Sequence, residues 1–374
     1  MKLHDFGIWP VYSEACRRDV DELLRAGGSL SAYRATKDFG TTPAKDSWAW
    51  RLEREIEKEF KVKHAVACNS GTASLHAVLF GVDVAGGEVI TSPYTFSATA
   101  SAILLAGGKP RFADVHSNTF CITKETVKRV VTRKTKAILP VSLFGYRPDY
   151  RDMAEFGLPI VEDGCQAVGA QRDGTFLQRV CLSQALSFNG GKNVPAGEGG
   201  ALVTNSERIA GKARLLMNHA ENFGSHGVGY NYRMNELTAC VAWHGLKDLD
   251  QRNKKRQQLA GILNEIRYFH PCIYRVVPSA EESHVWYVYP FLVRNGRSRR
   301  VFAKRMKAKG IHVGEGYTKP LHLLPAFRKY ARGPLPVVER LWKKELCLLD
   351  CVRPPATEED MRYVAQSMRE SLCD

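Results

Sequence analysis

The sequence predicts an α/β protein, with a large domain built on a mostly parallel central sheet covered by helices and a smaller α+β C-terminal domain. Its 374 residues are too many for one minimal core and suit two domains. From about residue 61, apolar β-rich runs alternate with helical segments, which is the pattern of a parallel sheet covered on both faces. A long helical pattern over residues 234–263 becomes strongly basic near Lys254, and a second unit follows it. We therefore expect a large domain over residues 1–250 and a small domain over residues 251–374.

Periodicity places the elements of the large domain in order along the chain. Amphipathic helices are expected over residues 14–26 and 47–60. Short apolar runs predict strands at residues 62–68, 88–91, 111–115, 136–141 and 159–162. Helical spacing between these runs predicts helices at residues 71–81, 95–105, 125–131 and 150–156. In sheets of this kind, ligands bind beyond the carboxyl ends of the strands.

The expected small domain contains four elements. They are a strand at residues 286–293, a helix at residues 301–309 ended by Gly310, a strand at residues 311–313 and a helix at residues 357–371. The sequence Thr357-Glu358-Glu359-Asp360 resembles a capping box at the start of the last helix.

The composition excludes several classes of protein. Hydrophobic content of 44% and charged content of 25% are those of an ordinary soluble globular protein. No apolar run approaches the length of a membrane span, and the first six residues hold no signal-peptide stretch, so we expect a cytoplasmic protein without membrane contact. The ten cysteines are scattered, without a CxxC pair or metal-ligand spacing with histidine. We interpret them as thiols in a reducing compartment and expect no metal.

The net charge of +15 bears on the partners of the protein. Basic clusters at residues 254–256, 297–305 and 340–344 lack interleaved aromatics and match no reading motif, so we expect no nucleic-acid partner. A positive field suits a polyphosphate or nucleotide substrate. A solvated basic face remains the simplest interpretation of most of these residues.

Lys192 is the most informative residue of the chain. It follows the apolar segment Ala185-Leu186, stands between two glycine clusters and precedes an apolar strand at residues 201–204. A lysine in such a partly buried turn can lose its proton and attack a carbonyl carbon. Upstream, Asp163 ends an apolar strand, and residues 69–73 form a small-residue turn that opens a helix. A lysine, a strand-end carboxylate and a phosphate-type turn are the parts of a pyridoxal phosphate (PLP) site.

Six motifs occur in the order and spacing of one known family. They are Gly71-Thr72-Ala73, Pro93-Tyr94-Thr95-Phe96, Glu162-Asp163-Gly164-Cys165-Gln166-Ala167, Ser187-Phe188 with Lys192-Asn193, Gly197-Glu198-Gly199-Gly200, and Asn231-Tyr232-Arg233-Met234. In these motifs the chain resembles the DegT/DnrJ/EryC1/StrS family of PLP-dependent sugar aminotransferases. The likeness is strong over residues 51–249 and weaker towards the C-terminus, through Pro320-Leu321-His322. The resemblance implies fold type I, the aspartate aminotransferase-like fold of PLP-dependent transferases.

The resemblance also implies roles at the cofactor ring. Lys192 looks like the Schiff-base lysine and the proton shuttle, and Asp163 like the partner of the pyridinium nitrogen. Gln166 is implied near the ring hydroxyl, and Phe96 looks like the aromatic residue that stacks on the ring.

Further residues are implied around the phosphate and the substrate. Gly71, Thr72 and Ser187 look like phosphate ligands, and the first two open a helix whose free N–H groups favour an anion. Asn231 matches the family asparagine that reaches the phosphate of the neighbouring subunit, which implies a homodimer with shared active sites. Tyr317 and His322 are the implied substrate-binding residues. The chain departs from the family beside them, because Gly316 stands where the family often carries a histidine.

The function implied is transfer of an amino group from glutamate or glutamine to a keto-sugar, with a nucleotide-linked sugar favoured, in amino-sugar biosynthesis. A cyclitol aminotransferase of aminoglycoside type shares these motifs and is the alternative. A PLP-dependent sugar dehydratase on the same fold is a rival in another class, but its hallmark is loss of the lysine that this chain retains as Lys192. A regulatory or nucleic-acid-binding protein is suggested by the charge alone.

Overall fold

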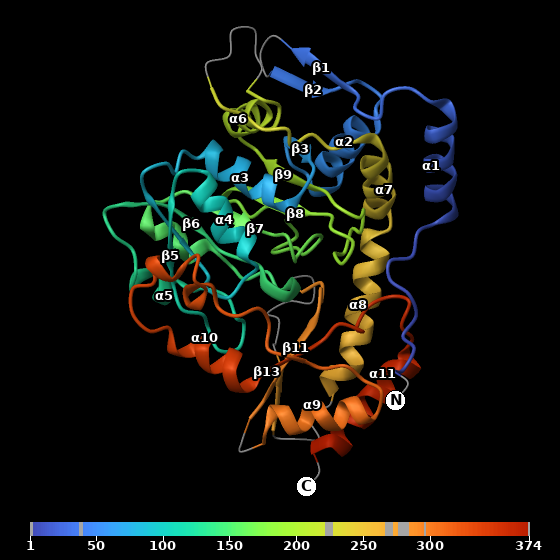
Figure 1. Cartoon of the computed structure of the whole chain (residues 1–374), viewed down its shortest axis with the longest axis vertical. Coiled ribbons are helices and arrows are strands. Elements are labelled where there is room, and N and C mark those ends of the chain that lie inside the picture. The colour runs from blue at the N-terminus through green and yellow to red at the C-terminus, as the bar shows by residue number, and fades with distance from the viewer. Residues whose placement is uncertain are drawn as a thin grey trace.

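The computed structural model describes residues 3–36, 40–220, 227–265, 272–275, 284–294 and 297–372, and it has the expected α/β architecture (Figure 1). Its centre is a seven-stranded sheet in the order β3-β9-β8-β7-β6-β4-β5. In that order the strands are β3 (His64–Cys68), β9 (Gly200–Thr204), β8 (Cys181–Ser187), β7 (Ile160–Asp163), β6 (Thr135–Leu139), β4 (Glu88–Thr91) and β5 (Lys109–Phe112). The five strands predicted from apolar runs all occur, each beginning within two residues of its predicted start.

The sheet is mixed rather than wholly parallel. Strands β8, β7, β6, β4 and β5 pair in parallel, whereas β9 is antiparallel to both β8 and β3. The reversal follows from the connection, because β8 and β9 are joined directly by the loop that carries Lys192. Two strands joined by such a loop pair antiparallel, since a parallel pair needs a crossover connection.

Helices cover both faces of this sheet (Figure 1). They are α1 (Glu14–Ala26), α2 (Trp48–Phe60), α3 (Gly71–Gly81), α4 (Ser97–Leu105), α5 (Lys124–Lys128), α6 (Glu207–Met217) and α7 (Glu236–Lys247). Successive strand residues point to opposite faces, so Val66 packs with α3, α4 and α6 while its neighbour Ala65 packs with α2 and α7. The 3₁₀-helices Leu143–Gly145 and Arg151–Phe156 lie between β6 and β7, and the hairpin of β1 (Tyr33–Thr36) and β2 (Gly40–Pro43) precedes α2.

The long helix expected over residues 234–263 is two consecutive helices. Helix α7 ends at Lys247, and α8 (Leu249–Asn264) begins after Asp248. In Figure 1, α8 continues downward from α7 and leaves the large sheet for the second sheet.

The second sheet has the order β10-β11-β13-β12 and lies entirely after residue 250. Its strands are β10 (Ile273–Arg275), β11 (Tyr289–Val293), β12 (Gly314–Glu315) and β13 (Leu346–Leu349), and its helices are α9 (Arg299–Ala308), α10 (Pro336–Arg340) and α11 (Glu358–Leu372). The strand expected at residues 311–313 is wrong by a few residues, because Ile311 and Val313 pack into the core beside the sheet and pairing begins only at Gly314.

The N-terminal segment packs on this second unit. His4 Nε2 lies 2.7 Å from a carboxylate oxygen of Asp360 on α11, and the His4 N–H donates to the carbonyl oxygen of Gly310 at 3.0 Å. The expected domain boundary near residue 250 stays a prediction. The first residues of the chain contact residues that lie after this boundary. No helix of the described residues is long and apolar enough to cross a membrane.

A buried ion pair holds the carboxyl end of β7. Glu162 and Arg147 are both fully buried, and Arg147 Nη2 donates to Glu162 Oε2 at 2.5 Å. Ser142 Oγ donates to the other oxygen of Glu162 at 2.6 Å. Because strand residues alternate in direction, Glu162 points into one face of the sheet and leaves its neighbour Asp163 on the other.

Removing one partner of this pair would leave the other buried without a counter-charge. We expect Glu162→Gln to lower the free energy of unfolding by about 3–5 kcal/mol, measured as the shift of the urea unfolding midpoint. Glu155→Gln is the control, because it breaks the exposed pair that Glu155 forms with Lys124 at 2.6 Å. Its midpoint should stay near that of the wild type, and equal shifts in the two variants would contradict this reading of the pair.

Candidate active site

A cavity of about 450 Å³ lies beyond the ends of β7 and β8. Eight of the ten predicted site residues line it, although they are far apart in sequence. They are Gly71, Thr72, Phe96, Asp163, Gln166, Ser187, Lys192 and Tyr317. The cavity therefore gathers the residues predicted for the cofactor, with the exception of Asn231, and one of the two predicted for the substrate.

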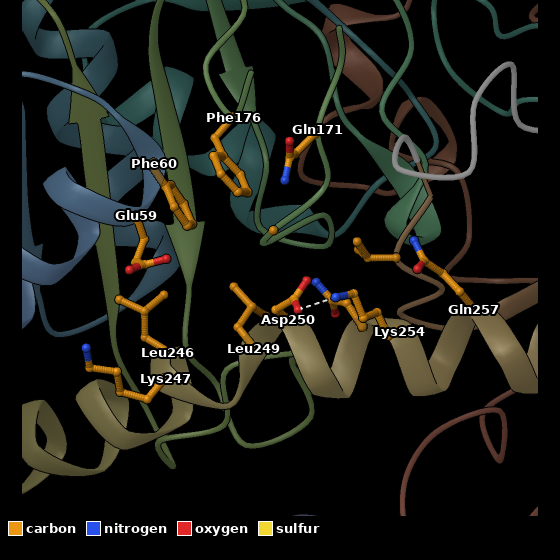
Figure 2. A pocket seen from close by; sticks show the side chains of 13 residues that line it. Glu59, Phe60, Gln171, Phe176, Leu246, Lys247, Leu249, Asp250, Lys254 and Gln257 are labelled. Carbon is orange, nitrogen blue, oxygen red and sulfur yellow. Dashed lines mark ion pairs between the residues drawn. The ribbon is translucent and has the colours of Figure 1, made fainter. Parts of the chain in front are cut away.

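A second cavity of about 350 Å³ lies at the junction of α7 and α8 and contains none of these residues (Figure 2). The rings of Phe60 and Phe176 stack in it with centroids 4.6 Å apart. Its four charged side chains all have ion-pair partners, namely Glu59 with Lys58, Lys247 with Glu55, and Asp250 with Lys254. The two cavities are similar in size, so chemistry rather than volume favours the first as the active site.

Lys192 stands at the tip of the loop between β8 and β9. The loop is closed by backbone hydrogen bonds from the N–H of Phe188 to the carbonyl of Gly199 at 2.9 Å and from that of Gly190 to Gly197 at 2.8 Å. Gly197 and Gly199 have φ values of 77° and 143°, which explains the second glycine cluster, because other residues rarely adopt them. Lys192 is half-buried as a result, with its side chain in the cavity.

Asp163 is a buried carboxylate with two oriented donors. Thr99 Oγ1, on α4, donates to Oδ2 at 2.7 Å, and the N–H of Cys165 donates to Oδ1 at 3.2 Å. Ionised carboxylates have further lone pairs, so Asp163 can also accept a charge-assisted bond from a protonated ring nitrogen. The predicted role is chemically possible where Asp163 stands.

The start of α3 forms an anion-binding turn against Ser187. Ser70 caps the helix by accepting a hydrogen bond from the N–H of Ala73 at 3.1 Å, and Gly71 and Thr72 follow it in the first turn. A Cβ on Gly71 would lie 2.8 Å from Cβ of Ser187, so only glycine allows this approach. The free N–H groups of the first turn and the Ser187 hydroxyl then face the same space, as a phosphate requires.

Gln166 and Tyr317 hold each other in the cavity wall. Gln166 accepts a hydrogen bond from the N–H of Phe144 at 2.9 Å and donates from Nε2 to Tyr317 Oη at 3.0 Å. Burial raises the pKa of Tyr317, so the phenol stays neutral and its hydroxyl can donate a hydrogen bond to a ligand. Phe96 completes the wall with a side chain that is 57% exposed, as a ring-stacking platform must be.

The last two predicted residues lie outside the cavity. Asn231 is exposed, and its carbonyl oxygen accepts a hydrogen bond from Asn69 Nδ2 at 3.2 Å. His322 is buried, with its Nε2 3.4 Å from Glu339 Oε1, and it does not line the cavity, so its contact with the substrate stays a prediction. Its motif turns into the protein because the N–H of Leu321 donates to the carbonyl oxygen of Pro93 at 2.8 Å.

Gly316 stands where the family often carries a histidine, and this difference has a steric reason. Gly316 has a φ of 84°, and a Cβ there would lie 3.1 Å from the carbonyl oxygen of Trp342. A histidine could not occupy this backbone without displacing Trp342.

Ten of the lining residues were not predicted from the sequence, and three of them, Thr99, Cys165 and Tyr287, bear on the chemistry of the cavity. Thr99 could have been found, because it lies four residues after Thr95 at the start of a helix, and the two hydroxyls are 2.9 Å apart. Cys165 stands within a quoted motif, and burial raises the pKa of its thiol, with a further contribution from Asp163. Tyr287 gave no signal, because it reaches the cavity from the segment before β11.

Comparison with known proteins decides the family. Residues 44–369 match the model of the DegT/DnrJ/EryC1/StrS aminotransferase family. The chain belongs to this family.

A pleiotropic regulatory protein of Geobacillus stearothermophilus is 33% identical over 334 residues, which cover 86% of this chain and 88% of the relative. The GDP-perosamine synthase of Caulobacter vibrioides is 30% identical over 345 residues, covering 85% and 89%. The solved structure of NtdA from Bacillus subtilis with bound cofactor PMP has a TM-score of 0.80 and 26% identity, covering 96% of this chain and 82% of that one.

Membership of the DegT/DnrJ/EryC1/StrS family confirms the predicted fold type I, the PLP cofactor and the activity of a sugar aminotransferase. The cavity fits PLP, because it combines a lysine, a buried carboxylate, an exposed aromatic ring and a glycine cradle that a Cβ would fill. Which residue holds which part of the cofactor stays a prediction. Among the described residues, no group of three or more histidine, cysteine, aspartate or glutamate side chains could hold a metal ion.

The close approach of Gly71 to Ser187 can be tested directly. We expect Gly71→Ala to weaken PLP retention about tenfold or more, because the new methyl group forces the phosphate turn away from Ser187. Gly190→Ala is the matched control, since its Cβ would meet no atom closer than 3.8 Å. Retention is measured from the cofactor absorbance that survives dialysis, and equal retention by both variants would show that the cradle does not hold the phosphate.

Proposed function

We propose that the protein transfers an amino group from glutamate or glutamine to the keto group of a nucleotide-linked sugar, in the biosynthesis of an amino sugar. The observation that carries the proposal is the single cavity that Lys192 and Asp163 share with the glycine cradle at Gly71. Family membership supplies the reaction class, and the cavity supplies the residues to perform it.

When bound, PLP supplies an electron sink and carries the amino group between the two substrates. We assign to Lys192 the covalent attachment of the cofactor and, once its amine is free, the transfer of a proton from the substrate carbon through Nζ. Asp163, held by Thr99 and the N–H of Cys165, keeps the ring nitrogen protonated by accepting its hydrogen bond. Tyr317 would donate a hydrogen bond from its hydroxyl into the cavity, and Phe96 would cover one face of the ring.

Two observations support a nucleotide-linked substrate. The net charge of +15 attracts polyphosphate anions and raises their encounter rate. One relative at 30% identity is by name a synthase of GDP-perosamine, a sugar carried on a nucleoside diphosphate. We therefore favour a nucleotide sugar over the cyclitol alternative.

The proposal is tested with the purified holoenzyme, glutamate or glutamine, and a panel of nucleotide-linked keto-sugars and free keto-cyclitols. Mass spectrometry should find an aminated nucleotide sugar, and borohydride should fix PLP on the peptide that contains Lys192. Lys192→Ala should lose both the aminated product and the borohydride label. Lys247→Ala, at the second cavity, should keep both of these signals. Amination of cyclitols alone would refute the substrate class, and a label on another lysine would refute the assignment of Lys192.

We also propose that the active site is shared across a homodimer. Asn231 carries an exposed side chain beside the turn of Asn69 that opens α3, yet it does not line the cavity of its own subunit. An amide donor suits the phosphate of a neighbouring subunit, because it binds an anion without adding a buried charge. Two-fold symmetry would make the two sites equivalent.

Subunit mixing tests the shared site. Asn231→Ala and Lys192→Ala should each be nearly inactive, and equal mixing with subunit exchange should restore about a quarter of the wild-type activity, because half of the dimers then carry one intact site of two. Lys192→Ala mixed with Asp163→Asn is the control, since both defects belong to the same subunit's half of the site and should not complement. A fully active monomer, or equal recovery in both mixtures, would contradict the proposal.

A further inference from the structure

The ring of Tyr287 covers the amine of Lys192. Lys192 Nζ lies 4.2 Å from the centre of that ring, and both side chains line the active-site cavity. No ion pair among the described residues includes Lys192, whereas the ring of Tyr287 lies over its amine. Tyr287 comes from the segment that leads into β11 of the second sheet.

The backbone that carries Tyr287 is strained and pressed against a glycine. Trp286 has a φ of 46°, a conformation that is rare for a bulky residue and persists only where neighbours enforce it. Gly145 is one such neighbour, because its carbonyl oxygen accepts the N–H of Val285 at 2.9 Å. A Cβ on Gly145 would lie 2.7 Å from the backbone nitrogen of Tyr287.

Two buried side chains hold the same segment. Arg256 of α8 is fully buried, and its Nη1 donates to the carbonyl oxygens of Trp286 and Tyr287 at 2.9 and 3.2 Å. His284 stacks on Trp286 with ring centroids 3.7 Å apart, and its Nδ1 accepts the N–H of Trp286 at 3.0 Å. Burial lowers the pKa of His284 to about 3, so the imidazole stays neutral and can accept this bond.

The lysine loop is tied to this segment as well. Asn193, next to Lys192, donates from Nδ2 to the carbonyl oxygen of Val285 at 3.1 Å and to Asn253 Oδ1 at 2.6 Å. Asn253 belongs to α8 and also lines the second cavity, the one drawn in Figure 2. The residue next to Lys192 and the backbone of Tyr287 are therefore both hydrogen-bonded to helix α8.

We propose that Tyr287 is a positioning residue for Lys192. The ring of Tyr287 holds the ammonium group of Lys192 in the cavity whenever that amine is not covalently bound to the cofactor. The inference rests on the proposed role of Lys192 and deepens it. An aromatic face attracts a cation through its quadrupole, more weakly than a buried carboxylate would. The contact thus keeps the amine of Lys192 in the cavity without tying it to a carboxylate.

The test measures the reactivity of the Lys192 amine in the full-length enzyme freed of PLP. The protein is treated briefly with limiting trinitrobenzenesulfonate near pH 8, and modification of the Lys192 peptide is quantified by mass spectrometry. We expect Tyr287→Leu to react about two- to fivefold faster, because the amine is then no longer held against an aromatic face. Tyr287→Phe keeps the ring and should react like the wild type.

Tyr317→Leu is the matched control for opening the cavity. It removes an aromatic ring from the same cavity, but the ring that lies over Lys192 Nζ is that of Tyr287. Wild-type reactivity in Tyr317→Leu supports the proposal. An unchanged rate in Tyr287→Leu, or an equal rise in Tyr317→Leu, overturns it.

The failure of this inference differs from the failure of the proposed function. Borohydride label on another lysine of the wild-type holoenzyme removes the role of Lys192 and the inference with it. Label on Lys192 together with an unchanged rate in Tyr287→Leu removes the inference alone.

A second pair of variants tests the support behind Tyr287 without touching the cavity. Gly145→Ala should displace the backbone of Tyr287 and raise the modification of Lys192 towards the Tyr287→Leu rate. Gly157→Ala is the control, because Gly157 also has a positive φ, of 63°, but a Cβ there would meet nothing within 4 Å. Equal modification rates in the two variants would show that Gly145 does not position Tyr287.

Discussion

The buried ion pair of Arg147 and Glu162 is the interaction on which the active site depends. On one side it fixes the last residues of β7, so that Asp163 stands on the opposite face of the sheet with Thr99. On the other side it anchors the loop of residues 142–147, since Arg147 also donates to the carbonyl oxygen of Ala170 at 3.0 Å. That loop holds Gln166 through the N–H of Phe144 and supports the segment of Tyr287 through Gly145. Two charges without access to water tolerate little displacement, because each is costly to bury alone.

The cavity is lined by segments that lead from both sheets of the fold. The large sheet contributes strand ends, the start of α3 and the Lys192 loop, which alone would leave the lysine open on one side. The second unit contributes Tyr287 before β11 and Tyr317 after β12. Each follows a residue with positive φ, but only Trp286 before Tyr287 is strained there, because Gly316 before Tyr317 adopts positive φ freely. The fold holds such conformations where side chains must be presented at fixed positions, because packing around them outweighs their local cost.

Family membership and geometry answer different questions about this protein. The family supplies the cofactor and the class of reaction, neither of which depends on a single contact. Geometry distinguishes residues that share a motif: Glu162 is structural while its neighbour Asp163 faces the cavity, and Tyr317 lines the cavity while His322 of the same segment pairs with Glu339. A motif match therefore assigns a segment to the site, and the direction of each side chain decides which of its residues can act there.

The sequence by itself determined the elements and motifs whose cause is local. Helices α1 and α3 and strand β4 have their predicted bounds, because apolar periodicity and the flanking turn residues are encoded within the segments themselves. Lys192, Asp163 and Gly71 were found in the same way, since a loop between glycine clusters, a strand end and a helix start are each visible in the local sequence. Only the tertiary structure decided the burial of His322 and the place of Tyr287 over Lys192. These depend on contacts between segments far apart in the chain, and no periodicity within one segment records which distant side chain will pack against it.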